Sequence, residues 1–293
     1  MSENIEAIVL GYTKFGENSV VVQTLSEAYG RRGFLVHVGK KAGMALLLPL
    51  NILEMDVVPN PKSTLWSARN LTAKDPLNGI RGNLYKNTMS LFLSEVLLRT
   101  VKDGPSEEGL YPWCVRSILT LDGLETDFAN FHVRFLLEFA AALGFSPTFE
   151  DIAPFAEKHL HQLKPFLTSG FSESMLIPLR GEDRNALCED LLRYLEYHTN
   201  PRSASSRSRC CGKCSDNNFA STLRYFVRIC YLYARNTELT ASTCTKSRSI
   251  RFSPFRRRTC IRLSSRDIPS RARKARPSPP PCTRRASPSI TTA

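Results

Sequence analysis

Residues 5–38, IEAIVLGYTKFGENSVVVQTLSEAYGRRGFLVHV, contain three β-rich runs in which apolar and polar side chains alternate. Alternation with a period of two, in runs separated by turn residues around Gly16 and Gly30, predicts three strands. Two more runs of this kind follow before residue 75. The five predicted strands cover residues 5–12, 19–25, 33–38, 50–58 and 64–70. Five short strands in about seventy residues predict a small closed barrel, of which the oligonucleotide-binding (OB) type is the commonest five-stranded form.

A different periodicity begins at Pro76, where apolar residues recur three and four positions apart. This spacing predicts helices, and Gly and Pro residues separate them. One predicted helix carries an apolar stripe that we interpret as core, made of Phe128, Phe131, Phe135, Phe139 and Leu143. The sequence therefore predicts an α+β chain, with a barrel over residues 1–75 and an all-α domain over residues 76–200. Its predicted helices cover residues 84–101, 110–121, 128–143, 160–167 and 184–197.

The chain changes in composition near Asn200. Residues 1–200 carry 19 Lys and Arg against 24 Asp and Glu, whereas residues 201–293 carry 21 against 3. The net charge of +13 therefore combines an acidic body with a strongly basic tail, and it is not by itself a nucleic-acid signature. The tail is rich in Arg, Ser, Thr and Pro and has little periodic apolar content, so we expect it to be largely disordered.

Cysteine usage and hydropathy indicate a cytoplasmic protein. Seven of the nine cysteines lie in the tail, and Cys114 and Cys188 fall in predicted helices, where we expect them to pack as small apolar side chains. The tail pair Cys211 and Cys214 has the spacing of half a zinc site, but no second pair follows, so we expect no metal. The N-terminus lacks a signal-peptide pattern, and no apolar run approaches the length of a membrane span.

Basic residues of the predicted barrel gather in its turns, and alternate turns of a closed barrel share an end. Several aromatic residues lie near them in sequence: Tyr12, Phe15, Tyr29 and Phe34. Cations beside a face that stacks bases are the combination that binds single strands. Lys and Arg also populate solvated turns that bind nothing, so this interpretation depends on the cluster and not on any single residue. The candidate DNA contacts are Lys14, Arg31, Arg32, Lys40 and Lys41.

No catalytic pattern is found in the sequence. The five histidines have no Cys or carboxylate partners at metal-ligand spacing, and residues 39–43 lack the order of a phosphate-binding loop. We therefore expect neither ATPase nor nuclease activity, and no cofactor. Arg134, which lies off the phenylalanine stripe, could bind a carboxylate of a partner, although an Arg on a solvated helix face is the commoner situation.

Four stretches of the body carry a family resemblance: EAIVLGYTKFGENSVVVQTLSEAYGRRGFLV (6–36), PLNGIRGNLYKNTMSLFLSEVLLRTVKDG (76–104), FHVRFLLEFAAALGFSP (131–147) and SESMLIPLRGEDRNALCEDLLRYLEYH (172–198). They resemble the RecO family of recombination mediators, in the form typical of the Bacteroidetes. The resemblance covers nearly all of residues 1–198. It implies an N-terminal OB barrel followed by a helical domain, which the periodicities predict independently.

The resemblance also implies a function in DNA repair and recombination, through the RecF pathway and at the nucleoid. It implies binding of single- and double-stranded DNA, annealing without ATP, partnership with RecR, contact with the acidic C-terminal tail of single-stranded DNA-binding protein (SSB), and indirect loading of RecA. Arg134 matches the arginine that opens the family's Arg-x-x-Leu-Leu helix, which is associated with binding of that tail. Positions where the family keeps basic residues match Lys14, Arg31, Arg32, Lys40 and Lys41.

Two departures from the family pattern are informative. Many members carry a four-cysteine zinc site after the Gly-x-x-Pro that ends this helix, but residues 146–151 contain no cysteine, so we expect a zinc-free body. After His198 the family continues into a closing helix, whereas this chain continues into the basic tail. A frameshift near codon 200 is our hypothesis for that change. Two alternatives stay open: a general single-strand binder without mediator partners, and a truncated mediator that does not function.

Overall fold

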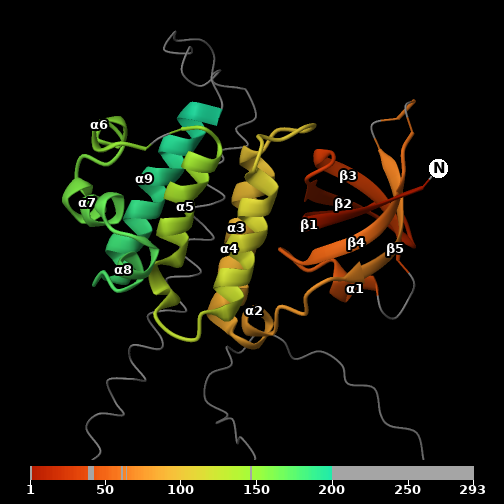
Figure 1. Cartoon of the computed structure of the whole chain (residues 1–293), viewed down its shortest axis with the longest axis horizontal. Coiled ribbons are helices and arrows are strands. Elements are labelled where there is room, and N and C mark those ends of the chain that lie inside the picture. Colours follow the sequence, from red (N-terminus) through yellow and green to blue (C-terminus); the bar gives the residue numbers. More distant parts are fainter. Residues whose placement is uncertain (1, 39–42, 61, 64, 146, 200–293) are drawn as a thin grey trace, which may run out of the picture. The chain divides into compact units, whose positions relative to one another are not determined.

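The computed structural model describes residues 2–38, 43–60, 62–63, 65–145 and 147–199. Within these ranges five strands come first and helices follow (Figure 1). The basic tail lies outside the described residues, and so do Lys40 and Lys41.

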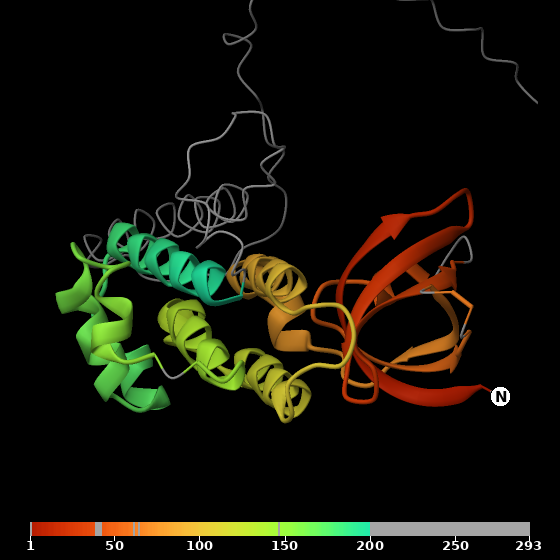
Figure 2. The same cartoon turned by 90° about the horizontal axis from the view of Figure 1, so that it is seen from above.

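The N-terminal part is a closed five-stranded barrel, as the alternating pattern predicts (Figures 1 and 2). Its strands are β1 (Glu3–Lys14), β2 (Ser19–Ser26), β3 (Gly30–His37), β4 (Ile52–Val58) and β5 (Trp66–Ala73), and the short helix α1 (Gly43–Leu46) lies between β3 and β4. The strands follow each other around the barrel as β1-β2-β3-β5-β4, and the parallel pair β3–β5 closes it. The interior is filled by one face of each strand, with residues such as Val9, Val22, Phe34, Met55 and Val57.

Strand β3 begins three residues earlier than the sequence pattern predicts. Gly30 has a φ of +60°, a left-handed conformation that suits glycine, and the strand starts there. Arg31 pairs with Leu25 of β2 in the strand register. The prediction that Arg31 and Arg32 lie in a turn is therefore wrong, because β3 pairs with β2 as far as Gly30.

The second part is all α-helical, which confirms the change of period at Pro76. Its longer helices are α3 (Leu84–Thr100), α4 (Leu110–Gly123), α5 (Phe131–Ala142), α7 (Leu160–Thr168) and α9 (Gly181–Thr199). Its shorter helices are α2 (Asn78–Gly82), the 3-10 turn η1 (Phe128–Asn130), α6 (Phe149–Ile152) and α8 (Phe171–Met175).

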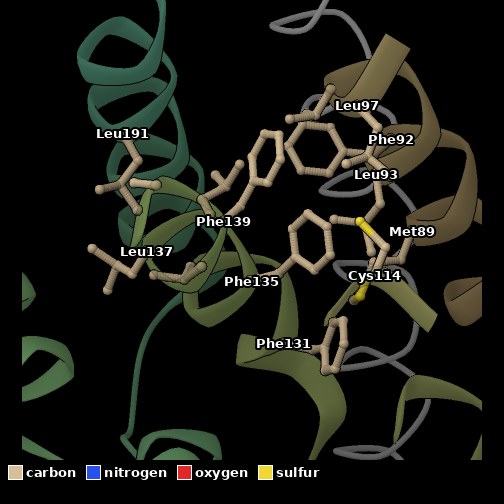
Figure 3. Close-up of a cluster of buried hydrophobic side chains, with 14 of the residues drawn as sticks. Met89, Phe92, Leu93, Leu97, Cys114, Phe131, Phe135, Leu137, Phe139 and Leu191 are labelled. Atoms are coloured by element: carbon tan, nitrogen blue, oxygen red, sulfur yellow. The ribbon is translucent and has the colours of Figure 1, made fainter. Parts of the chain in front are cut away.

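The phenylalanine stripe of α5 lies in the helical core, as predicted. Phe131, Phe135 and Phe139 are buried, and Figure 3 shows them on the side of α5 that faces the apolar residues of α3. Leu137 points the other way, toward Leu191 of α9 (Figure 3). Phe128 and Leu143, at the ends of the stripe, are partly buried against the same core.

Apolar and polar contacts both join the barrel to the helices. Ile8, Leu25 and Ile52 belong to the same buried cluster as the helical core. Arg81 of α2 donates from Nη2 to the carbonyl oxygen of Pro49 and to Oδ1 of Asn51, both at 2.6 Å. Burial lowers the pKa of Arg81 below its ordinary value. Because these bonds reach backbone and side chain at once, they fix the loop before β4 against the helices.

Candidate nucleic-acid interface and partner pocket

Arg31 is tied to the helical part of the chain. Its Nη2 lies 2.6 Å from Oδ1 of Asp103, and its Nη1 donates to the carbonyl oxygen of Leu98 at the end of α3. Its backbone N–H and carbonyl both pair with Gly104, at 3.0 and 2.9 Å. The side chain is only 17% exposed. These contacts make Arg31 an anchor between the barrel and the loop that follows α3.

Arg32 packs on a tryptophan at the start of β5. Its guanidinium carbon lies 4.0 Å from the ring centroid of Trp66, and Tyr29 meets the same ring edge-on at 5.0 Å. The indole N–H of Trp66 donates to the carbonyls of Asn60 and Ser63, at 3.0 and 3.2 Å. Trp66 thus holds the β4–β5 connection, and Arg32 stabilises Trp66 through a cation–π contact.

Tyr29, beside this pair, is also engaged. Its hydroxyl is hydrogen-bonded to the carboxylate of Glu3, and that hydrogen bond is the main reason why the pKa of Tyr29 lies above its ordinary value. Arg32 and Tyr29 therefore stabilise the end of the barrel at which the β2–β3 turn lies.

Lys14 lies at the opposite end of β2 and is exposed to solvent. It is the last residue of β1 and pairs with Val20, and the turn is closed by a 2.9 Å bond from the N–H of Phe15 to the carbonyl of Ser19. The end of β3 lies beside this turn, because His37 Nδ1 is 2.8 Å from Ser19 Oγ. Among the five candidate DNA contacts, Lys14 is the exposed one within the described residues.

The four aromatic residues that were candidates for base stacking also divide into two that are engaged in the fold and two that are exposed. Phe34 is fully buried in the barrel core, and Tyr29 is held by Trp66 and Glu3. Tyr12 and Phe15, which flank Lys14 in sequence, are 43% and 60% exposed. Tyr12 and Lys14 share one face of β1, and Phe15 follows as the first residue of the β1–β2 turn.

Arg134 of α5 holds the end of a neighbouring helix. Its Nη1 donates to the carbonyls of Phe166 and Ser169, at 3.1 and 2.9 Å, and its Nε lies 2.6 Å from Glu138. The carbonyls at a helix C-terminus have no partners within the helix, so a cation there stabilises the end of α7. The side chain is 19% exposed.

A pocket of about 270 Å³ lies beside Arg134, between α4, α5 and α8. Its lining consists of Trp113, Arg116, Ser117, Thr120, Phe131, Phe135, Glu138 and Phe171. The aromatic residues form an apolar wall, and Arg116 is the arginine of the lining. This combination suits a ligand that has both an apolar group and a carboxylate. Sequence reasoning missed Arg116, although its spacing from Trp113 and Thr120 places the three residues on one face of α4.

Comparison with known proteins identifies the family. The RecO N-terminal family model matches residues 1–76, and the RecO C-terminal model matches residues 81–154. The chain belongs to the RecO family. Among its relatives, a DNA repair protein RecO from Bacteroides fragilis is 32% identical over 155 residues, which are 52% of this chain and 64% of the relative. The chain therefore matches less than two thirds of that RecO protein.

Other RecO proteins match longer or similar stretches. DNA repair protein RecO of Flavobacterium psychrophilum is 26% identical over 221 residues, 68% of this chain and 92% of the relative. That of Flavobacterium johnsoniae is 31% identical over 157 residues, 52% of this chain and 66% of the relative.

The described part of this RecO chain contains no group of three or more His, Cys, Asp or Glu residues that could hold a metal ion. Cys114 and Cys188 are both buried, and burial raises the pKa of the Cys114 thiol well above its ordinary value. Cys114 therefore packs as a small apolar side chain, as predicted. None of the described helices is long and apolar enough to cross a membrane.

Proposed function

We propose that the chain is a DNA repair and recombination mediator that binds DNA, anneals complementary strands, and helps RecA load onto strands coated by SSB through the RecF pathway. Membership of the RecO family supports this proposal, as does the exposed group of Tyr12, Lys14 and Phe15 on an OB-type barrel. Positioned cations and base-stacking side chains act by binding alone, so the proposed role is not enzymatic.

An annealing assay tests the proposal. Two complementary oligonucleotides, one carrying a fluorophore and the other a quencher, are mixed with the full chain, and pairing is expected to be faster than the spontaneous reaction. The same assay on a chain ending at Thr199 serves as control, because the 21 basic residues of the tail are expected to attract DNA without specificity. If the full chain accelerates pairing and the chain ending at Thr199 does not, the annealing activity does not lie in residues 1–199.

The proposed partners are RecR and the acidic C-terminal tail of SSB. For the acidic tail, the supporting feature is the pocket beside α5, in which Phe131, Phe135 and Trp113 offer an apolar wall and Arg116 a cation. Arg134 acts at the same site by holding the end of α7, which precedes the pocket residue Phe171. A terminal carboxylate bound by Arg116, with an apolar side chain in the pocket, satisfies these two parts of the lining. The carboxylate of Glu138, which also lines the pocket, lies 2.6 Å from Nε of Arg134, so its charge is paired.

A peptide-binding measurement tests this partner. An acidic peptide that ends in an aromatic residue with a free carboxylate is expected to bind the full chain, and the same peptide with an amidated end is expected to bind more weakly. Arg116→Ala should lower the affinity for the peptide with the free carboxylate by about tenfold, since one charged hydrogen bond contributes roughly 1.5–3 kcal/mol. The affinity for the amidated peptide should not change. Equal binding of both peptides by the wild-type chain would count against the pocket.

A further inference from the structure

The pocket between α4, α5 and α8 carries charges of opposite sign on two of its helices. Arg116 on α4 is exposed, and the side chain of Glu138 on α5 is 31% exposed. Ser117 and Thr120 add hydroxyl groups on α4, and the rest of the lining is aromatic. Because the cation and the carboxylate come from different helices, the α4 wall attracts a negative group of a ligand and the α5 wall does not.

Glu138 is paired through one of its two oxygens. Its Oε1 lies 2.6 Å from Nε of Arg134, while Nη1 of that arginine donates to the carbonyls of Phe166 and Ser169. Among the described residues, none donates a hydrogen bond to Oε2 of Glu138. Arg134 itself does not line the pocket. The α5 wall therefore presents the carboxylate of this pair to a ligand, and not its guanidinium.

The size of the pocket determines which part of a peptide lies beside Glu138. The volume of about 270 Å³ corresponds to a sphere about 8 Å across, which is about two residues of extended chain at roughly 3.3–3.6 Å each. When the last side chain of a peptide fills the aromatic lining and its terminal carboxylate binds Arg116, the residue before it lies at the rim. That residue is then within reach of Glu138, because the pocket is no longer than two residues.

We infer that Glu138 makes the pocket selective for the residue before the C-terminal one: it rejects an acidic side chain there and admits an uncharged or a basic one. This inference rests on the proposed binding of an acidic C-terminal tail and restricts it, since the acidic residues of the tail must then lie further from its end. A carboxylate beside Glu138 is repelled, and the interaction of two partly exposed charges changes affinity by up to about fivefold.

Three labelled peptides test the inference on the full chain. They share an acidic N-terminal half, a glycine spacer and a C-terminal phenylalanine with a free carboxylate, and differ in the residue before the phenylalanine, which is lysine, asparagine or aspartate. Fluorescence anisotropy is expected to give affinities that fall in that order, by about three- to fivefold from asparagine to aspartate. Non-specific attraction by a chain of net charge +13 gives the opposite order.

Glu138→Gln tests whether this residue causes the order. The amide keeps the size of the side chain and an oxygen that can accept from Arg134, but it removes the negative charge. The aspartate peptide is then expected to bind at least as tightly as the asparagine peptide. Glu157→Gln removes the same charge from an exposed position outside the lining and should leave the wild-type preference unchanged. Thermal melting checks that both variants are folded.

The outcomes are distinguishable. A wild-type chain that binds the aspartate peptide as tightly as the asparagine peptide, or a preference that survives Glu138→Gln, overturns the inference and leaves peptide binding intact. A preference that both variants abolish equally also overturns it, because net charge then explains the order. A wild-type chain that binds none of the three peptides overturns the proposed partner and the inference with it.

Discussion

At the β2–β3 turn, Arg31 contacts Leu98 and Asp103 and Arg32 lies on Trp66, whereas at the β1–β2 turn Lys14 is exposed between Tyr12 and Phe15. The two turns lie at opposite ends of β2, and each has a glycine and an aromatic residue. Lys14, the last residue of β1, lies next to the first turn, and Arg31 and Arg32, near the start of β3, lie next to the second. The two turns differ in what lies opposite them, because the β2–β3 turn packs on the loop after α3.

Cations next to a turn are available to a ligand only where the fold leaves them unengaged. A guanidinium that already binds a backbone carbonyl and a carboxylate would have to break those contacts before it could bind a phosphate. We therefore expect substitutions at the β2–β3 turn to lower stability, and substitutions at the β1–β2 turn to lower DNA affinity.

Gly30→Ala is expected to lower the free energy of unfolding by about 3 kcal/mol or more. A Cβ there would lie 2.1 Å from the carbonyl oxygen of Gly104, and φ is +60°. Overpacking costs roughly 1–3 kcal/mol and a left-handed conformation roughly 1–2 kcal/mol. Gly16→Ala at the other turn is the matched control, because φ there is +126° but nothing lies within 4 Å. Urea unfolding midpoints compare the two, and equal losses would contradict a close approach at Gly30.

Arg31→Ala is expected to lower the free energy of unfolding by about 2 kcal/mol, because a largely buried charged donor to the Leu98 carbonyl is lost. Asp103→Asn should cost less than about 0.5 kcal/mol, since Asp103 is 75% exposed and solvent screens the pair. Thermal or urea unfolding of both variants measures the difference. A loss from Asp103→Asn as large as that from Arg31→Ala would mean that the ion pair, and not the carbonyl contact, anchors the barrel.

Much of the fold could be predicted because it depends on local patterns. The alternation in residues 5–38 predicts the first three strands, and the spacing of Phe131, Phe135 and Phe139 predicts the buried face of α5. The start of β3 could not be predicted in this way. It depends on Gly30 and Arg31 meeting Gly104, about seventy residues further along the chain, and a local period carries no information on such a contact.

The candidate site could be predicted less well, and for the same reason. Residue type identifies Lys14, Arg31 and Arg134 equally as cations, but only the fold brings Leu98 to Arg31 and the end of α7 to Arg134. The spacing of Arg116 from Trp113 does not by itself predict a pocket, because Phe131, Phe135 and Phe171, which complete the aromatic lining, come from α5 and α8. Whether a cation is engaged or exposed is a tertiary property.

Arg32→Ala is expected to lower the free energy of unfolding by about 1 kcal/mol, the size of a partly exposed cation–π contact. The same change should alter the fluorescence of Trp66, which is measured in a Trp113→Phe background so that one tryptophan of the two in the chain reports. Lys14→Ala in that background is the control and should leave the emission unchanged. If Arg32→Ala leaves both stability and emission unaltered, Arg32 is not part of the barrel structure and returns as a candidate DNA contact.

Lys14→Ala is expected to change stability by less than about 0.5 kcal/mol, because the side chain is exposed. Its effect should instead appear in the salt dependence of single-strand binding, where the loss of one phosphate contact reduces the slope of log affinity against log salt by about 0.7. Lys158→Ala removes one exposed charge from the helical part and is the matched control. Equal reductions in slope from both variants would mean that DNA responds to net charge alone. A reduction confined to Lys14→Ala would locate the phosphate contact at the β1–β2 turn, because a diffuse field acts on both charges alike.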